Sequence, residues 1–133
     1  MLKKDEEKNK DERNEIIKSI FELSQRIRYA EIFNDKAIKI AGGMKTEIKS
    51  LEPDDKAIKV NNSTAEYVRL LMAHSRYFGE FKILYCEFEK FNLFVFELNE
   101  KNIISITTEP ELGWEFADKI RVEIKKWSKR NKE

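Results

Sequence analysis

The sequence predicts an α+β domain with a five-stranded antiparallel sheet and helices on both faces. Three segments, near the start, middle and end of the chain, place apolar residues at helical spacing. The intervals between them hold short strand-like runs rich in β-branched and aromatic residues. The expected order of elements is α-β-β-α-β-β-β-α, and 133 residues is the size of a single domain.

The first helix is expected at about residues 11–26. Ile16, Ile17 and Ile20 recur at the spacing that gives an amphipathic helix one apolar side. Residues 1–11 carry both charges and no aromatic side chain, which predicts a flexible charged extension before the helix. The domain proper is therefore expected to begin near residue 12.

A β-hairpin is predicted next. The run "IRYAEIF", residues 27–33, alternates as a strand, and a second strand is expected over 37–41 after a tight turn at Asn34-Asp35-Lys36. Gly42-Gly43 follows. No glycine begins the spacing of a P-loop, so the pair is interpreted as a turn or bulge where the second strand leaves the sheet, with a ligand contact as the alternative.

A middle helix is predicted over about 64–78. Ser63 and Glu66 have the spacing of a capping box, and Gly79 is placed to end the helix. Its apolar positions cover more than one narrow stripe, so the helix is expected to contact structure on two sides. They are Tyr67, Val68, Leu70, Leu71, Met72, Tyr77 and Phe78.

Three strands in a meander should follow the middle helix. The runs at 81–89, 91–98 and 103–107 are separated by short polar turns. The first two runs are apolar on both sides, whereas a sheet with one solvated face would alternate apolar and polar residues. The second face is therefore expected to be covered too, or to contact a partner.

The last helix is predicted from Thr108-Glu109-Pro110-Glu111 to about residue 128. Proline and acidic residues favour the first turn of a helix, and Trp114 and Trp127 fall at helical spacing on its apolar side. Residues 129–133 form a basic tail, so the single domain spans about 12–128. Nucleic-acid binding by this tail is disfavoured because Trp127 shares the register of the expected core.

Composition and charge exclude several classes of function. The 26 basic and 25 acidic residues leave a net charge of +1, so no overall field attracts nucleic acid or an anionic membrane. No apolar run is long enough to span a membrane. Cys86 is the single cysteine, and no signal-peptide pattern follows Met1, so a cytoplasmic location is expected.

No catalytic, metal or cofactor site is expected. His74 is the only histidine, which leaves a metal without a second nitrogen ligand, and it is interpreted as a packing or interface residue whose titration could make association pH-dependent. Cys86 alternates with apolar neighbours and is interpreted as a small buried hydrophobe. Glu87, Glu89 and Glu97 are interpreted as a solvated sheet edge rather than an acid–base pair.

The element order, together with "RIRYAEIFNDKAIKIAGGM" and "ISITTEPE", resembles the roadblock/dynein light-chain class of longin and profilin-like architectures. The same stretches are similar to an uncharacterised group of small archaeal proteins. The resemblance implies that the first and last helices cover one sheet face and the middle helix lies on the other. It also implies homodimerisation through the middle helices and nearby edge strands, with regulation or scaffolding of small GTPases.

Two functional hypotheses follow. The first is a non-enzymatic homodimeric interaction module that scaffolds or regulates a protein partner. Its expected interface is Tyr67, Leu71, Met72, His74, Ser75, Tyr77 and Phe81. The second is a small-molecule sensor of the profilin-like or PAS-like kind, with a pocket between sheet and middle helix lined by Tyr67, Tyr85 and Phe94. An enzyme is disfavoured because no acid, base and nucleophile are visibly assembled.

Overall fold

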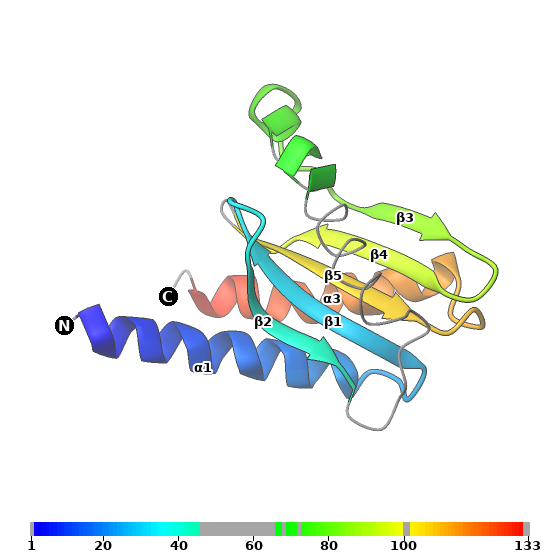
Figure 1. Ribbon diagram of the computed structural model, residues 1–133, viewed down its shortest axis with the longest axis horizontal. Helices are drawn as coiled ribbons and strands as arrows, with labels where there is room; N and C mark the ends of the chain where they lie inside the picture. Colours follow the sequence, from blue (N-terminus) through cyan, green and yellow to red (C-terminus); the bar gives the residue numbers. More distant parts are fainter. Residues whose placement is uncertain (1, 46–65, 68, 72, 100–101, 132–133) are drawn as a thin grey trace.

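The computed structural model describes residues 2–45, 66–67, 69–71, 73–99 and 102–131. Figure 1 shows two long helices beside one sheet. The elements are α1 (Leu2–Phe21), β1 (Ile27–Asn34), β2 (Lys39–Met44), β3 (Leu84–Glu87), β4 (Asn92–Glu97), β5 (Asn102–Thr108), the 3-10 helix η1 (Trp114–Phe116) and α3 (Ala117–Asn131). Residues 66–67, 69–71 and 73–78 are also helical, and we call them the middle helical segment.

The sheet is antiparallel throughout, and its strands lie in the order β2-β1-β5-β4-β3. The hairpin β1–β2 and the meander β3–β4–β5 therefore join where β1 pairs with β5. Opposite residues at this junction include Ala30 with Ile106 and Ile32 with Ile104. The predicted five-stranded antiparallel sheet is confirmed, and β2 and β3 form its two edges.

The main core lies between one face of the sheet and the helices α1 and α3 (Figure 1). From α1 it takes Ile16, Ile17 and Ile20, which are the residues whose spacing predicted this helix. Strand residues and the apolar side of α3 complete it. They include Ala30, Ile32, Phe94, Ile104, Ile106, Ile120, Ile124 and Trp127. The expectation that the first and last helices share a face is confirmed.

The opposite face of the sheet is also buried. Phe33, Val95 and Ile103 form a second cluster, against which Phe81 and Leu84 pack. Two polar side chains, Glu31 and Ser105, are buried on the same face and lie opposite each other across β1 and β5. The sequence indicated this by making the meander strands apolar on both sides.

The first helix lies further toward the N-terminus than predicted. It begins at Leu2 and ends at Phe21, so the expected bounds of 11–26 were wrong at both ends. The early residues are mainly Lys, Glu and Asp, and lysine and glutamate have good intrinsic helix propensity even without an apolar side. At the end of the helix the Leu23 amide donates a hydrogen bond to the Ile20 carbonyl, in the turn that leads to β1.

The Gly-Gly pair lies inside a strand, not at its exit. β2 runs from Lys39 to Met44, so the predicted end at residue 41 was wrong. Gly42 pairs with Glu31 at a φ of +87°, and a Cβ added there would stand 2.0 Å from the Ala30 carbonyl oxygen. Glycine is needed at this position because β2 approaches β1 too closely for any side chain.

The last helix begins later than predicted. Pro110 lies in a turn, and α3 starts at Ala117 after η1. Trp114 therefore leaves the predicted apolar side of the helix and is 54% exposed. Trp127 is buried as predicted, and its indole N–H donates a 3.2 Å hydrogen bond to the Ser19 hydroxyl of α1.

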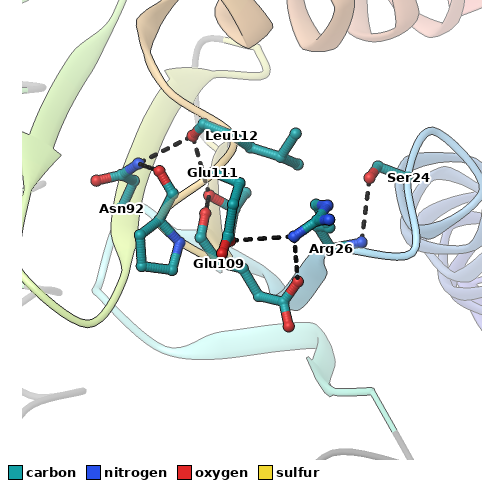
Figure 2. A network of polar contacts seen from close by, with 8 residues as sticks. Ser24, Arg26, Asn92, Glu109, Glu111 and Leu112 are labelled. Carbon is teal, nitrogen blue, oxygen red and sulfur yellow. Dashed lines mark hydrogen bonds and ion pairs between the residues drawn. The ribbon is translucent and has the colours of Figure 1, made fainter.

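Polar contacts hold the turn between β5 and η1 (Figure 2). The side-chain amide of Asn92 donates to the carbonyls of Pro110, at 3.3 Å, and Leu112, at 2.9 Å. On the outside, the Arg26 guanidinium lies 3.5 Å from Glu109 and 3.2 Å from Glu111. These bonds hold Pro110 in a turn, so no helix starts there as predicted. Trp114 follows this turn.

Candidate functional site

The middle helical segment presents apolar side chains to solvent. Tyr67 is 66% exposed, Leu70 60%, Tyr77 84% and Phe78 85%. With His74, which is also exposed, these residues follow a three- and four-residue spacing that places them on one side of a helix. We call this set the exposed stripe. At the C-terminal end of the stripe, the rings of His74 and Phe78 lie with their centroids 6.4 Å apart.

A different side of the same segment is partly covered. Leu71 and Ser75, four residues apart, are the half-buried positions among its described side chains. The segment ends as predicted at Gly79, whose amide donates to the Ser75 carbonyl at 3.0 Å with a φ of +86°. The other predicted features, Met72 and the Ser63 end of the capping box, lie outside the described residues.

The chain runs directly from this segment to the edge strand β3 (Figure 1). Phe81, the last predicted interface residue, is half-buried and packs against the second cluster. An edge strand carries backbone N–H and C=O groups on its open side that another strand can pair with. The exposed stripe and β3 together form the candidate functional site, an apolar helix side followed by an open sheet edge.

The three residues predicted to line a ligand pocket occupy different environments. Phe94 is fully buried in the core, and its ring contacts that of Tyr85 at a centroid distance of 4.9 Å. Tyr85 also meets the Trp114 ring edge-on at 5.3 Å. Tyr67 lies on the exposed stripe. The contacts of Tyr85 and Phe94 are those of packed aromatic side chains.

The surroundings of Tyr85 affect its ionisation. Burial raises the pKa of the Tyr85 phenol, and the negative charges of Glu87 and Glu115 raise it further. Both carboxylates are exposed, so the phenol lies at the boundary between the core and an acidic surface. The neutral phenol is therefore the form that this position favours.

His74 and Cys86 are not part of a metal centre in the described part of the chain, where no three His, Cys, Asp or Glu side chains gather. Cys86 is half-buried on the edge strand β3, so the expectation of a buried residue was wrong. An edge position covers a side chain on fewer sides than a central strand does. Among the described residues, no helix is long and apolar enough to cross a membrane.

Sequence reasoning missed two residues of the exposed stripe, Leu70 and Phe78, which were counted as helix positions but not as interface. The spacing from Tyr67 already contained the signal, because positions three and eleven residues later fall on the same side of a helix. The spacing did not show which of these positions are exposed to solvent. Leu71, which was included, lies on the half-buried side.

No family model matches the chain, and no curated protein matches it. Solved structures do. MglB from Myxococcus xanthus has a TM-score of 0.63 at 14% identity over 90% of this chain and 84% of its own. The gliding protein MglB from Thermus thermophilus gives 0.62 at 14% identity over 87% of both chains. A roadblock/LC7 domain from Streptomyces avermitilis gives 0.61 at 13% identity over 88% and 92%.

At these identities the likeness concerns the fold alone. The chain has the roadblock/LC7 fold, as the element order of the sequence predicted. The similarity to a group of small archaeal proteins stays a prediction. Oligomeric state, partner and regulation are not transferred by a fold, so they depend on the geometry of the candidate site.

Proposed function

We propose that this protein is a non-enzymatic interaction module that forms a homodimer through the exposed stripe and the edge strand β3. The observation that supports this most directly is the exposure of four large apolar side chains on one side of the middle helical segment. Apolar surface gathered in this way is typical of protein interfaces, and tyrosine and phenylalanine are enriched there.

The adjoining strand adds a second reason. β3 is short and lies at the edge of the sheet, so its open side can pair with the same strand of a second copy. A two-fold symmetric contact uses the same patch on both subunits. One such contact would cover the helix stripe and the sheet edge together, with the predicted residues Tyr67, His74 and Tyr77 near its centre.

The finer part of the proposal is that the dimer scaffolds or regulates a small GTPase. It is supported by the roadblock fold and by the similarity to MglB structures, one of which bears the description "MglB with tetrameric arrangement" at a TM-score of 0.58 and 18% identity. A pull-down with GDP or a GTP analogue added tests it. Nucleotide-dependent recovery of a GTPase is the expected result, and recovery that ignores the nucleotide would contradict it.

The solution mass tests the dimer. Light scattering across a concentration series should give twice the chain mass of 15.9 kDa. The variant Phe78→Asp should give the single-chain mass, because a charge on an apolar contact loses its hydration without gaining a partner. Phe78 is 85% exposed, so the variant should keep its fold.

Val122→Asp is the matched control. Val122 is also exposed, at 57%, but lies on α3 rather than on the middle helical segment. The same charge there should leave the mass of the dimer unchanged. A single-chain mass for the unmodified protein at every concentration would refute the homodimer, and equal dissociation by both variants would refute the placement of the interface.

The sensor hypothesis makes the opposite prediction. A monomer whose unfolding temperature rises with a metabolite would favour a ligand at Tyr67, Tyr85 and Phe94, because a ligand specific for the folded state stabilises it. A dimer that no metabolite stabilises would leave the interaction module as the better account.

A further inference from the structure

The exposed stripe contains one side chain whose charge changes near neutral pH. His74 is the only histidine of the chain, and it is exposed. It lies between Leu70, which is 60% exposed, and Phe78, which is 85% exposed. A contact that covers both ends of the stripe therefore also covers the His74 ring. An imidazole in water gains a proton between pH 8 and pH 5, so the charge of this surface depends on pH in that range.

The side chains one helical turn from His74 carry no charge in this range. They are Leu70, Leu71, Tyr77 and Phe78, at three and four residues on either side. A tyrosine phenol ionises only near pH 10. The His74 ring lies 6.4 Å from the Phe78 ring, and none of the ion pairs found between described residues involves His74. A proton on His74 therefore has no carboxylate beside it on the stripe.

The charged groups further along this part of the chain balance one another. Between residues 66 and 87, three are acidic, three are basic, and all six are exposed. They are Glu66, Arg69, Arg76 and Glu80 on or next to the middle helical segment, and Lys82 and Glu87 toward the end of β3. Arg69 and Arg76 project from the side of the helix away from His74. No surplus of negative charge therefore favours the protonated ring.

Covering His74 costs more when it is charged. Apolar surface that displaces water from an ion raises its free energy unless a partner of opposite charge replaces the water. In a two-fold contact the facing surface is the same stripe of a second copy, which brings apolar side chains and a second histidine. The contact with Phe78 already exists in the single chain, so it does not offset this cost on association.

We propose that protonation of His74 separates the two copies as the pH falls below about 6.5, so that the stripe is a pH-dependent contact. This inference rests on the proposed homodimer. Above that pH the ring is neutral in both states and association is at full strength. Below it the single chain binds a proton that the dimer excludes, so association weakens as the pH falls. Each dimer that forms then releases two protons, one from each subunit.

Sedimentation equilibrium of the full chain, without a histidine tag and at constant ionic strength, tests the switch. The dimer dissociation constant should be about tenfold or more higher at pH 5.5 than at pH 7.5, because two protons oppose association. The variant His74→Gln keeps a neutral polar side chain at both pH values, so its constant should be the same at both. Circular dichroism at pH 5.5 checks that the fold is retained.

Glu87→Gln is the matched control. It removes an ionisable group from β3, the other half of the proposed interface, but leaves His74 in place. The ratio between the two dissociation constants should therefore stay as large as in the unmodified protein. A ratio that disappears in Glu87→Gln, or that persists in His74→Gln, would overturn the assignment to His74.

NMR provides a readout at the residue itself. Because the chain has a single histidine, its ring signals belong to His74 without ambiguity. The midpoint of their pH titration should lie at lower pH in a concentrated sample, where the dimer predominates, than in a dilute one. Equal midpoints, or a higher midpoint in the concentrated sample, would contradict the exclusion of the proton.

Failure of the switch and failure of the dimer are distinguishable. A dimer with the same dissociation constant at pH 5.5 and pH 7.5 refutes the switch and leaves the homodimer standing. A single-chain mass at pH 7.5 at every concentration refutes the homodimer, and the switch with it.

Discussion

The same kinds of side chain occur in two opposite environments in this molecule. Ile20, Phe94 and Ile120 between the sheet and the helices are wholly buried, whereas Tyr77 and Phe78 on the middle helical segment are more than four-fifths exposed. Both sets have helical or strand spacing that predicts burial. The difference teaches that amphipathic spacing indicates a contact but does not say whether the contact lies within the chain or with another one.

The largest difference in stability between the two sets should appear when one phenylalanine of each is replaced by alanine. Phe94→Ala should lower the free energy of unfolding by about 3–5 kcal/mol, since it removes a buried ring and leaves a cavity. Phe78→Ala should change it by about 0.5 kcal/mol or less in the single chain. Urea denaturation measures both.

Protein concentration separates the two effects. A loss that arises from association depends on concentration, whereas a loss of core packing does not. A concentration-independent loss in Phe78→Ala as large as that in Phe94→Ala would show that the stripe is part of the core, and the comparison would fail.

Replacing one glycine in each region by alanine should give the next largest difference in the free energy of unfolding. Gly42 and Gly79 both have a φ near +86°, which costs an alanine about 1 kcal/mol. At Gly42 the added Cβ would also collide with the Ala30 carbonyl, whereas nothing lies within 4 Å of it at Gly79. Gly42→Ala should therefore lower the unfolding free energy by at least about 2 kcal/mol, and Gly79→Ala by about 1 kcal/mol. Equal losses on thermal or urea unfolding would contradict the close approach of β2 to β1.

The smallest effect is a dependence on alkaline pH at the rim of the core. The pKa of Tyr85 is raised in the folded state, mainly by burial, so the neutral phenol stabilises the fold. This contribution is complete below the unfolded tyrosine pKa of about 10 and is lost as pH rises through the folded value. Tyr85→Phe should therefore make the fall in unfolding free energy at alkaline pH less steep, as followed by urea denaturation. An unchanged slope would mean that Tyr85 is as solvated in the folded state as in the unfolded one.

Much of the fold was predictable from local sequence. Ile16, Ile17 and Ile20 located the core side of α1, and the strand-like runs predicted five strands in an antiparallel sheet, although not their order in it. Boundaries were less predictable: α1 extends to Leu2 through residues with no apolar side, and Pro110 entered a turn held by Asn92. The extension of α1 follows from the helix propensity of its lysine and glutamate residues rather than from apolar spacing, and the turn depends on hydrogen bonds from the side chain of Asn92, which is distant in sequence.

The candidate sites were predictable in part. The middle helix was placed as an interface from its excess of apolar residues, but Leu70 and Phe78 were identified only when exposure was known. Glu87 was interpreted as a solvated edge residue, and the structure leaves it exposed. Its position opposite Asn92 depends on the register of β3 and β4, which the spacing within one strand does not give.

The sequence by itself determined the α+β class, the element order and the absence of a net field, because periodicity and charge are properties of the chain. Tertiary structure decided which apolar surface stayed open and which acids received a cation. Arg26 reaches Glu109 and Glu111 across 83 and 85 positions of sequence. Such pairings depend on distance in space, which the sheet register sets and which no local pattern contains.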